Sequence, residues 1–301
     1  MKKFLIISLL FLLALNPCKA LDLVMQEDCS ASMPFQSSRD SDTILWLARV
    51  AANGGSVSPA AIRGVDNSIK FLKYTGYWSN ILIFYPMVGD QWEAMWTPVV
   101  GAQWTDGVVA LNHSTAYAEA TGVTGDGLGW INSNQNQNTL STTNNSICIY
   151  ARDAVGIGVG MAYIGATGSD NVSQLQKHSA LGTQIILNAG EASQGKAYVT
   201  DLTAALWCGT RTASNSISIY RNKTNVGTNG AATTQPYTWA NKNIYVMASN
   251  NDGVVTGIAN GLILAGVIVL KQGMTQTDVN NIYAAFKMWN DPVGRTGLRD
   301  H

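Results

Sequence analysis

The stretch Ser216-Ile217-Ser218-Ile219-Tyr220-Arg221-Asn222 alternates polar and apolar side chains almost residue by residue. Successive side chains of a strand point to opposite faces, so Ile217 and Ile219 share one face. The pattern therefore predicts a half-buried β-strand. Asn222-Lys223 follows directly and predicts a turn.

Further short strands are expected on both sides of this one. They span residues 81–88, 108–118, 146–152, 156–164, 184–188, 196–202, 205–210, 243–248 and 262–270. Polar turns such as Gly125-Asp126-Gly127 and Asn251-Asp252-Gly253 separate them. A parallel sheet would need a helix between successive strands, so this spacing predicts a mainly β fold, a two-sheet jelly-roll β-sandwich over 79–297.

Two short helices are expected before the sandwich, in a lead-in over residues 40–78. Apolar residues between 44 and 48 fit a helix that ends at Asn53-Gly54-Gly55. Ser58 is expected to cap a second helix, with Pro59 in its first position and Gly76 just beyond its end.

One amphipathic helix, residues 275–290, is expected to close the fold. Thr275 is its predicted cap, Asp278 stands where a capping box needs an acceptor, and Pro292 stops the helix. Its apolar positions recur at helical spacing, which predicts one face packed on the sandwich.

The N-terminus has the features of a secretory signal peptide. Lys2 and Lys3 precede an apolar run from Phe4 to Leu15, and a small residue, Ala20, precedes the expected cleavage site. The run is too short to span a bilayer comfortably, so no stable membrane span is expected after cleavage. Residues 21–39 show no periodicity and predict an extended arm.

The charge balance argues against nucleic acid as a partner. Without Lys2, Lys3 and Lys19, the mature chain has 16 basic and 19 acidic side chains, a net of −3. Phosphate binding needs a clustered surplus of Lys and Arg. Only 13% of residues are charged, so solubility depends on Asn, Gln, Ser and Thr, as in many extracellular β-proteins.

Three cysteines remain in the mature chain, an odd number for an oxidising compartment. Cys148 and Cys208 each lie in an apolar run, so they are either a disulfide pair or two buried small hydrophobes. Cys29 would then be a free thiol or a link to another chain.

One ordered set of segments covers most of residues 42–296: Leu47-Ala48-Arg49-Val50, Gly54-Gly55, Ile69-Lys70-Phe71-Leu72, Gly76-Tyr77-Trp78-Ser79, Ile83-Phe84-Tyr85-Pro86-Met87-Val88-Gly89, Gly209-Thr210-Arg211-Thr212, Ile217 to Asn222, Asn281-Ile282-Tyr283-Ala284-Ala285-Phe286 and Gly294-Arg295. Together they resemble bacteriophage virion appendage proteins of the tail or head-fibre type, which carry concanavalin A-like, laminin-G-like jelly rolls. The resemblance implies adhesion or a structural part of a virion. A signal peptide is unusual in that family, and Lys223 stands where many such hairpins carry Gly.

Concanavalin A-like folds also carry glycosidases and lyases, so a catalytic alternative depends on paired carboxylates. A retaining glucanase needs two of them about 5 Å apart. The mature chain has Glu27, Glu93, Glu119 and Glu191, and none has an acidic residue two or four positions away. Glu93 alone has a cleft-like aromatic setting, which makes it the weak catalytic candidate.

Other catalytic and cofactor motifs are absent from the sequence. It contains no zinc-binding His-Glu-x-x-His, no Gly-x-Ser-x-Gly elbow and no phosphate-binding loop followed by Lys-Ser or Lys-Thr. His113 is expected to be a polar strand residue. Asp126 and Asp252, in two of the turns, are weak candidates for calcium ligands, which turn chemistry explains equally well.

Four tryptophans, Trp92, Trp96, Trp104 and Trp130, lie in a segment with few clear strands. Aromatic faces stack on sugars, although a Trp in a sandwich is more often part of the core. Residues 132–138, which include Asn134 and Asn136, are mostly Asn and Gln and are expected to form an exposed loop rich in amide groups. Together they are the candidate glycan-binding surface.

These observations predict an exported, non-enzymatic, lectin-like module for adhesion or virion and surface structure. Its expected location is extracellular or periplasmic, with a virion as the alternative. Its expected partners are a cell-surface glycan or other virion or surface proteins, with homo-oligomers a further option. Two alternatives remain open: a secreted glycoside hydrolase or polysaccharide lyase, and a purely architectural oligomer subunit that would show an exposed apolar patch.

Overall fold

The structure is a computed structural model that describes residues 38–102, 105–106, 117–153, 162–167, 172–178, 182–189, 196–199, 205–229, 241–295 and 298. The chain divides into two units, Met1–Ser38 and Arg39–His301, and apart from Ser38 every described residue belongs to the second. The predicted signal peptide, Cys29, Trp104, His113 and Glu191 therefore lie outside the described residues.

Two β-sheets form the body of the fold. Within the described residues, sheet A has eight strands and sheet B has nine. In sheet A the order is β13 (Thr224–Asn229), β12 (Ser216–Arg221), β11 (Ala205–Ala213), β6 (Asn145–Asp153), β17 (Asn260–Leu270), β4 (Gly122–Asp126) and β3 (Tyr117–Ala118), and β1 (Ile81–Tyr85) pairs with β17. All of these pairs are antiparallel.

Sheet B has a branch at one strand. Its order is β10 (Lys196–Val199), β9 (Gly182–Ala189), β8 (Val172–His178), β7 (Ala162–Thr167), β14 (Asn243–Val246), β5 (Ile131–Asn136) and β2 (Thr105–Asp106). The short hairpin of β15 (Ser249–Asn251) and β16 (Val254–Thr256) joins β7 through a parallel pair. This hairpin covers part of the candidate site.

The central strands of sheet A, β6, β11 and β17, are buried on both faces, which explains their nearly continuous apolar runs. On β6, Ile147 and Ile149 face the core between the two sheets. Cys148 and Tyr150 between them face a second core beneath the helices. The alternation of side chains along the strand supplies both cores at once.

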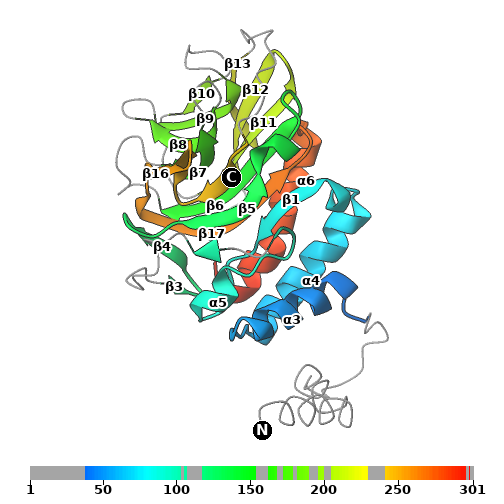
Figure 1. The fold of residues 1–301 in the computed structure, drawn as a ribbon. Coiled ribbons are helices and arrows are strands. Elements are labelled where there is room, and N and C mark those ends of the chain that lie inside the picture. Colours follow the sequence, from blue (N-terminus) through cyan, green and yellow to red (C-terminus); the bar gives the residue numbers. More distant parts are fainter. Residues whose placement is uncertain are drawn as a thin grey trace, which may run out of the picture. The chain divides into compact units, whose positions relative to one another are not determined.

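Helices cover the face of sheet A that points away from sheet B. The main ones are α3 (Ser41–Ala52), α4 (Pro59–Tyr74) and α6 (Gln276–Asn290). Figure 1 shows α4 and α6 beside β1 and on the far side of the sandwich from β7 to β10. Shorter turns are α5 (Trp92–Met95), η1 (Trp78–Asn80), η2 (Gln137–Thr139) and η3 (Asp291–Val293). Among the described residues, no helix has both the length and the apolarity that a membrane crossing requires.

The predicted helix caps are confirmed. Ser58 Oγ accepts a hydrogen bond from Ala61 N at 3.1 Å, and Pro59 occupies the first turn of α4. Thr275 and Asp278 form the expected capping box of α6. Gly76, just past α4, has φ +82, a conformation that glycine adopts without strain.

The predicted fold class, a mainly β two-sheet sandwich with helices at both ends, is confirmed. The strand Ser216–Arg221 has the predicted bounds, and Ile217 and Ile219 are fully buried. The predicted strands 108–118 and 156–164 lie partly outside the described residues. The sequence did not predict β2, β4, β5, β8, β13, β15 or β16.

Candidate functional site

The outer face of sheet B, between β5 and β14, presents a group of asparagines. Ile244 and Val246 on β14 are buried in the core between the sheets, so Asn243 and Tyr245 point away from sheet A. Asn132 lies directly opposite Tyr245 and shares its face.

Asn136, at the end of β5, lies on the same face as Asn132. It pairs directly with Asn243, and the register shifts between this pair and the next. Asn134 lies within the shift and has φ +53, a left-handed conformation that asparagine tolerates better than most residues. Because of this register shift, β5 advances four residues, from Asn132 to Asn136, while β14 advances two, between Tyr245 and Asn243.

A stacked aromatic pair lies beside these amides. The ring centroids of Trp130 and Tyr245 are 4.0 Å apart with an interplanar angle of 32°. Ala248, Val255 and Ile258 pack against the pair, so the β15–β16 hairpin covers it. Trp130 is 8% exposed and Tyr245 7%. The buried Trp130 Nε1 has no hydrogen-bond partner among the described residues, which leaves a donor unused.

The hairpin is held over the pair by polar contacts. Asn250 Nδ2 donates to the carbonyl oxygen of Asn243 at 3.0 Å, and Asn250 Oδ1 accepts from Gly253 N at 2.8 Å. Lys242 Nζ lies 3.6 Å from Asp252 Oδ1 at the hairpin turn. One side chain, Asn250, thus fixes both the turn and its distance from β14.

Some amide groups of this face are already used, and others are not. Asn132 Oδ1 accepts from Asn134 N at 2.9 Å, and Asn136 Nδ2 donates to Asn241 Oδ1 at 2.6 Å. Asn132 Nδ2 and the side-chain amide of Asn243 make no hydrogen bond with the described residues. We call Asn132, Asn136 and Asn243, with Trp130 and Tyr245, the amide face.

The prediction that residues 132–138 form an exposed loop is wrong. Residues up to Asn136 belong to β5, and η2 follows. Gln137 is fully buried. Asparagine disfavours strands intrinsically, but pairing with β14 on one side and β2 on the other supplies the ladder hydrogen bonds that offset this.

The prediction of an exposed tryptophan platform is also wrong for the described residues. Trp92 is 5% exposed and Trp96 1%, and both belong to the core between the sheets. Their rings meet edge to face at 5.3 Å, and Trp96 lies 6.3 Å from the ring of Tyr85. Packing of this aromatic area stabilises the core, so neither ring is free to stack on a ligand. Trp130 lies on the correct face but beneath the hairpin.

The candidate carboxylates have local partners. Glu119 accepts from Ser58 N at 3.2 Å and from Ser58 Oγ, at the positive end of α4. Asp126 Oδ1 accepts from Leu128 N at 2.8 Å and from Gly129 N at 2.9 Å, which is turn chemistry.

The structure brings no further carboxylate or histidine ligands to the two calcium candidates, Asp126 and Asp252, among the described residues. Asp252, the second candidate, pairs with Lys242. In the part of the chain that the structure describes, no group of three or more His, Cys, Asp or Glu residues is placed to hold a metal ion. Glu93 lies in the first turn of α5, between the two buried tryptophans.

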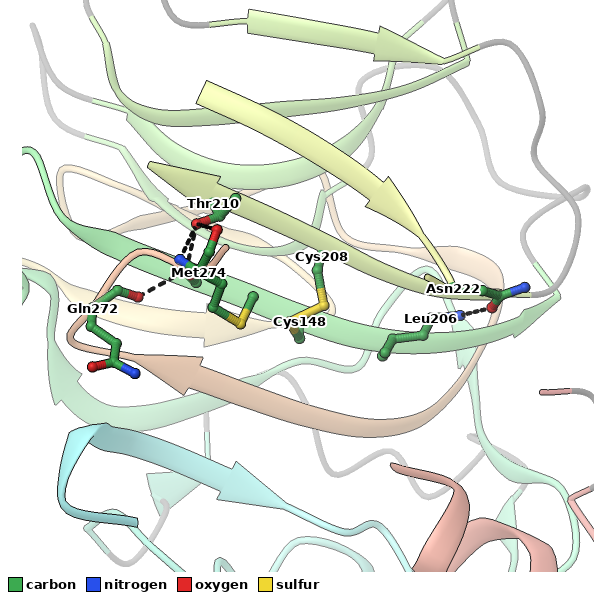
Figure 2. The surroundings of a disulfide bond; sticks show 8 residues. Cys148, Leu206, Cys208, Thr210, Asn222, Gln272 and Met274 are labelled. Carbon is green, nitrogen blue, oxygen red and sulfur yellow. Dashed lines mark hydrogen bonds between the residues drawn. A yellow bond between two sulfur atoms is a disulfide. The ribbon is translucent and has the colours of Figure 1, made fainter. Parts of the chain in front are cut away.

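The disulfide alternative for Cys148 and Cys208 is confirmed. The two residues lie directly opposite each other on β6 and β11, with Cα atoms 4.1 Å apart. Figure 2 shows the disulfide bond crossing between the two strands. The disulfide is buried beneath the helices, on the other side of sheet A from the amide face. In the same view, near one end of β11, Met274 N donates to Thr210 Oγ1 at 2.6 Å.

No protein-family model matches the chain, and neither does any curated protein. Among solved structures, it is similar to domain 4 of AbnA, an extracellular arabinanase from Geobacillus stearothermophilus in complex with arabinotriose. The identity is 13% and the TM-score 0.47, over 68% of this chain and 99% of that one. A structure of botulinum neurotoxin type C, described as dependent on two ganglioside molecules for cell entry, matches at 11% identity and TM-score 0.47, over 71% of this chain and 53% of that one.

The carbohydrate-binding module CBM40 of the Ruminococcus gnavus IT-sialidase, bound to α2,3 sialyllactose, matches at 10% identity and TM-score 0.36. That match covers 48% of this chain and 84% of the module. The assignment of a site in this chain rests on its own residues.

Proposed function

We propose that this protein is an exported, non-enzymatic, lectin-like module that binds glycans through the amide face. The observation that carries the proposal is the pair of unused amides, Asn132 Nδ2 and the Asn243 side chain, on the same side of sheet B as the Trp130–Tyr245 stack.

An asparagine amide suits sugar hydroxyls because it offers both donors and an acceptor. Asn132 and Asn243 lie on paired strands, so their backbones are fixed before a ligand arrives. The described charges beside the face, Lys242 and Asp252, pair with each other, so recognition would depend on hydroxyl groups.

Asp252 and Glu119 do not form a hydrolytic pair. A glycosidase needs two carboxyl groups facing each other across one cleft. Asp252 lies on the hairpin of sheet B, whereas Glu119 follows β3 of sheet A and contacts the start of α4. The two therefore cannot act on one glycosidic bond.

Export is supported by two independent features. Residues 1–20 have the pattern of a signal peptide. The Cys148–Cys208 disulfide fits an oxidising compartment outside the cytosol. The resemblance of residues 42–296 to phage appendage proteins supports a virion or cell-surface setting, where glycans and other surface proteins are the partners.

The proposal is tested with residues 21–301 on a panel of immobilised polysaccharides. The double substitution Asn132→Ala, Asn243→Ala is expected to weaken retention roughly 10- to 30-fold, because two hydrogen bonds contribute about 1 kcal/mol each. Asn280→Ala is the matched control, since Asn280 is an exposed asparagine on α6 in the helical layer. Unchanged retention of the double variant would show that the amide face is not the site.

A further inference from the structure

Helix α3 carries apolar residues on two sides. Trp46 and Val50 face inward and belong to the core beneath the helices. The opposite side is exposed, and Ser41 is its one polar member. The exposed apolar residues are Ile44, Leu45, Ala48, Ala51 and Ala52.

These five residues form one continuous stripe. At 100° per residue they fall within an arc of about 120°, and the buried residues fall on the other side of the helix. Ile44 is 50% exposed and Leu45 59%. A surface helix normally presents polar side chains there, so a contiguous apolar stripe indicates a contact surface.

We propose that this outer face of α3 binds the α3 helix of a second copy of the chain in antiparallel orientation. The size of the side chains changes along the stripe, from Ile44 and Leu45 at the N-terminal end to Ala51 and Ala52 at the C-terminal end. An antiparallel pair places large residues against small ones at both ends, with Ala48 of each copy at the two-fold axis. A parallel pair would oppose the large residues at one end and leave a gap at the other.

The helix dipoles also favour the antiparallel arrangement. In an antiparallel pair the positive N-terminal end of each helix lies beside the negative C-terminal end of the other. The charged residues of α3 are already paired within the chain, because Asp42 Oδ2 lies 2.6 Å from Lys73 Nζ and Arg49 Nη2 donates to the carbonyl oxygen of Val99. The contact uses the same patch on both copies, so it closes as a dimer.

The size of the surface predicts a weak dimer. Twelve residues of helix rise about 18 Å, and one such pair buries well below the roughly 1,200 Å² of a stable interface. We therefore expect a monomer–dimer equilibrium at micromolar or higher concentration. It is independent of glycan binding, because α3 and the amide face lie in different layers of the fold (Figure 1).

The first test is sedimentation equilibrium of residues 21–301 across micromolar to millimolar concentration. The wild-type chain is expected to dimerise reversibly, and Ile44→Glu with Leu45→Glu is expected to leave only monomer. Val254→Glu, at a side chain 64% exposed on β16, is the control and should dimerise like the wild type. A wild-type chain that stays monomeric overturns the proposal. So does a dimer that survives both glutamates.

Cross-linking tests the orientation, in a Cys29→Ser background that removes the other unpaired thiol. Ala48→Cys should cross-link to itself on mild oxidation, Ala52→Cys should not, and a mixture of Ile44→Cys with Ala52→Cys should form the mixed dimer. Self-linking of Ala52→Cys would contradict the antiparallel arrangement. A chain that dimerises only after removal of residues 21–37 would identify that segment, and not a second copy, as the occupant of the face.

Discussion

Asp66 joins the start of α3 to α4. Its Oδ1 accepts from Asp40 N at 2.8 Å and from Thr43 Oγ1 at 2.7 Å, and its Oδ2 lies 2.6 Å from Lys70 Nζ. Burial by itself would raise the pKa of Asp66. The hydrogen bonds from Lys70, Asp40 N and Thr43 outweigh burial and hold the pKa below its usual value.

This lowered pKa predicts a specific loss of stability in acid. The charged carboxylate stabilises the fold above the unfolded-state pKa of about 3.9, and the contribution disappears as the pH falls through the lower folded-state pKa. Urea unfolding from pH 7 to pH 2 should show Asp66→Asn less stable than the wild type at neutral pH. The two curves should converge in strong acid, and a constant difference at every pH would contradict this role.

Single residues also show what the sequence could predict. Ser58 and Thr275 act on backbone N–H groups three residues away, so their capping could be predicted from local spacing. The inward direction of the Trp92 ring could not be predicted from local spacing. Its ring packs on Trp96 and, 5.8 Å away, on Tyr117, and the position of Tyr117 depends on sheet pairing distant in the chain.

At the scale of elements, α6 depends on its capping box. Thr275 Oγ1 accepts from Asp278 N at 3.3 Å, and Asp278 Oδ2 accepts from Thr275 N at 2.7 Å. We expect Thr275→Ala to lower the free energy of unfolding by about 1 kcal/mol, because the backbone N–H of Asp278 loses its acceptor, while the N–H of residue 275 keeps Asp278 Oδ2.

Chemical denaturation of Thr275→Ala measures that loss against a close control. Thr277→Ala changes an exposed threonine in the first turn of the same helix, outside the cap. It should be within about 0.5 kcal/mol of the wild type. Equal stability of the two variants would show that the cap contributes nothing.

The strands show where prediction from sequence stops. Ser216–Arg221 could be predicted because its alternation matches its burial, with Ile217 and Ile219 inside. The strand Ile131–Asn136 could not be predicted from the sequence, since four of its six residues are Asn or Gln. Its strand conformation comes from its neighbours in sheet B, so the amide face appears only when β5 and β14 are paired.

At the scale of the whole molecule, the layers separate the two proposed surfaces. The helices cover one face of sheet A and expose the outer side of α3. The amide face lies on the far side of sheet B, next to the β15–β16 hairpin. Substitutions in α3 should therefore leave glycan binding intact, and substitutions in the amide face should leave self-association intact.

The most direct test of glycan binding without catalysis is one incubation with two readouts. Residues 21–301 are placed on a panel of polysaccharides, with calcium and then with a chelator, and retention is scored together with new reducing or unsaturated ends. We expect retention on at least one polysaccharide and no new ends. New ends would show an enzyme and direct attention to Glu93 and Glu119, and no retention on any polysaccharide would contradict glycan binding through the amide face.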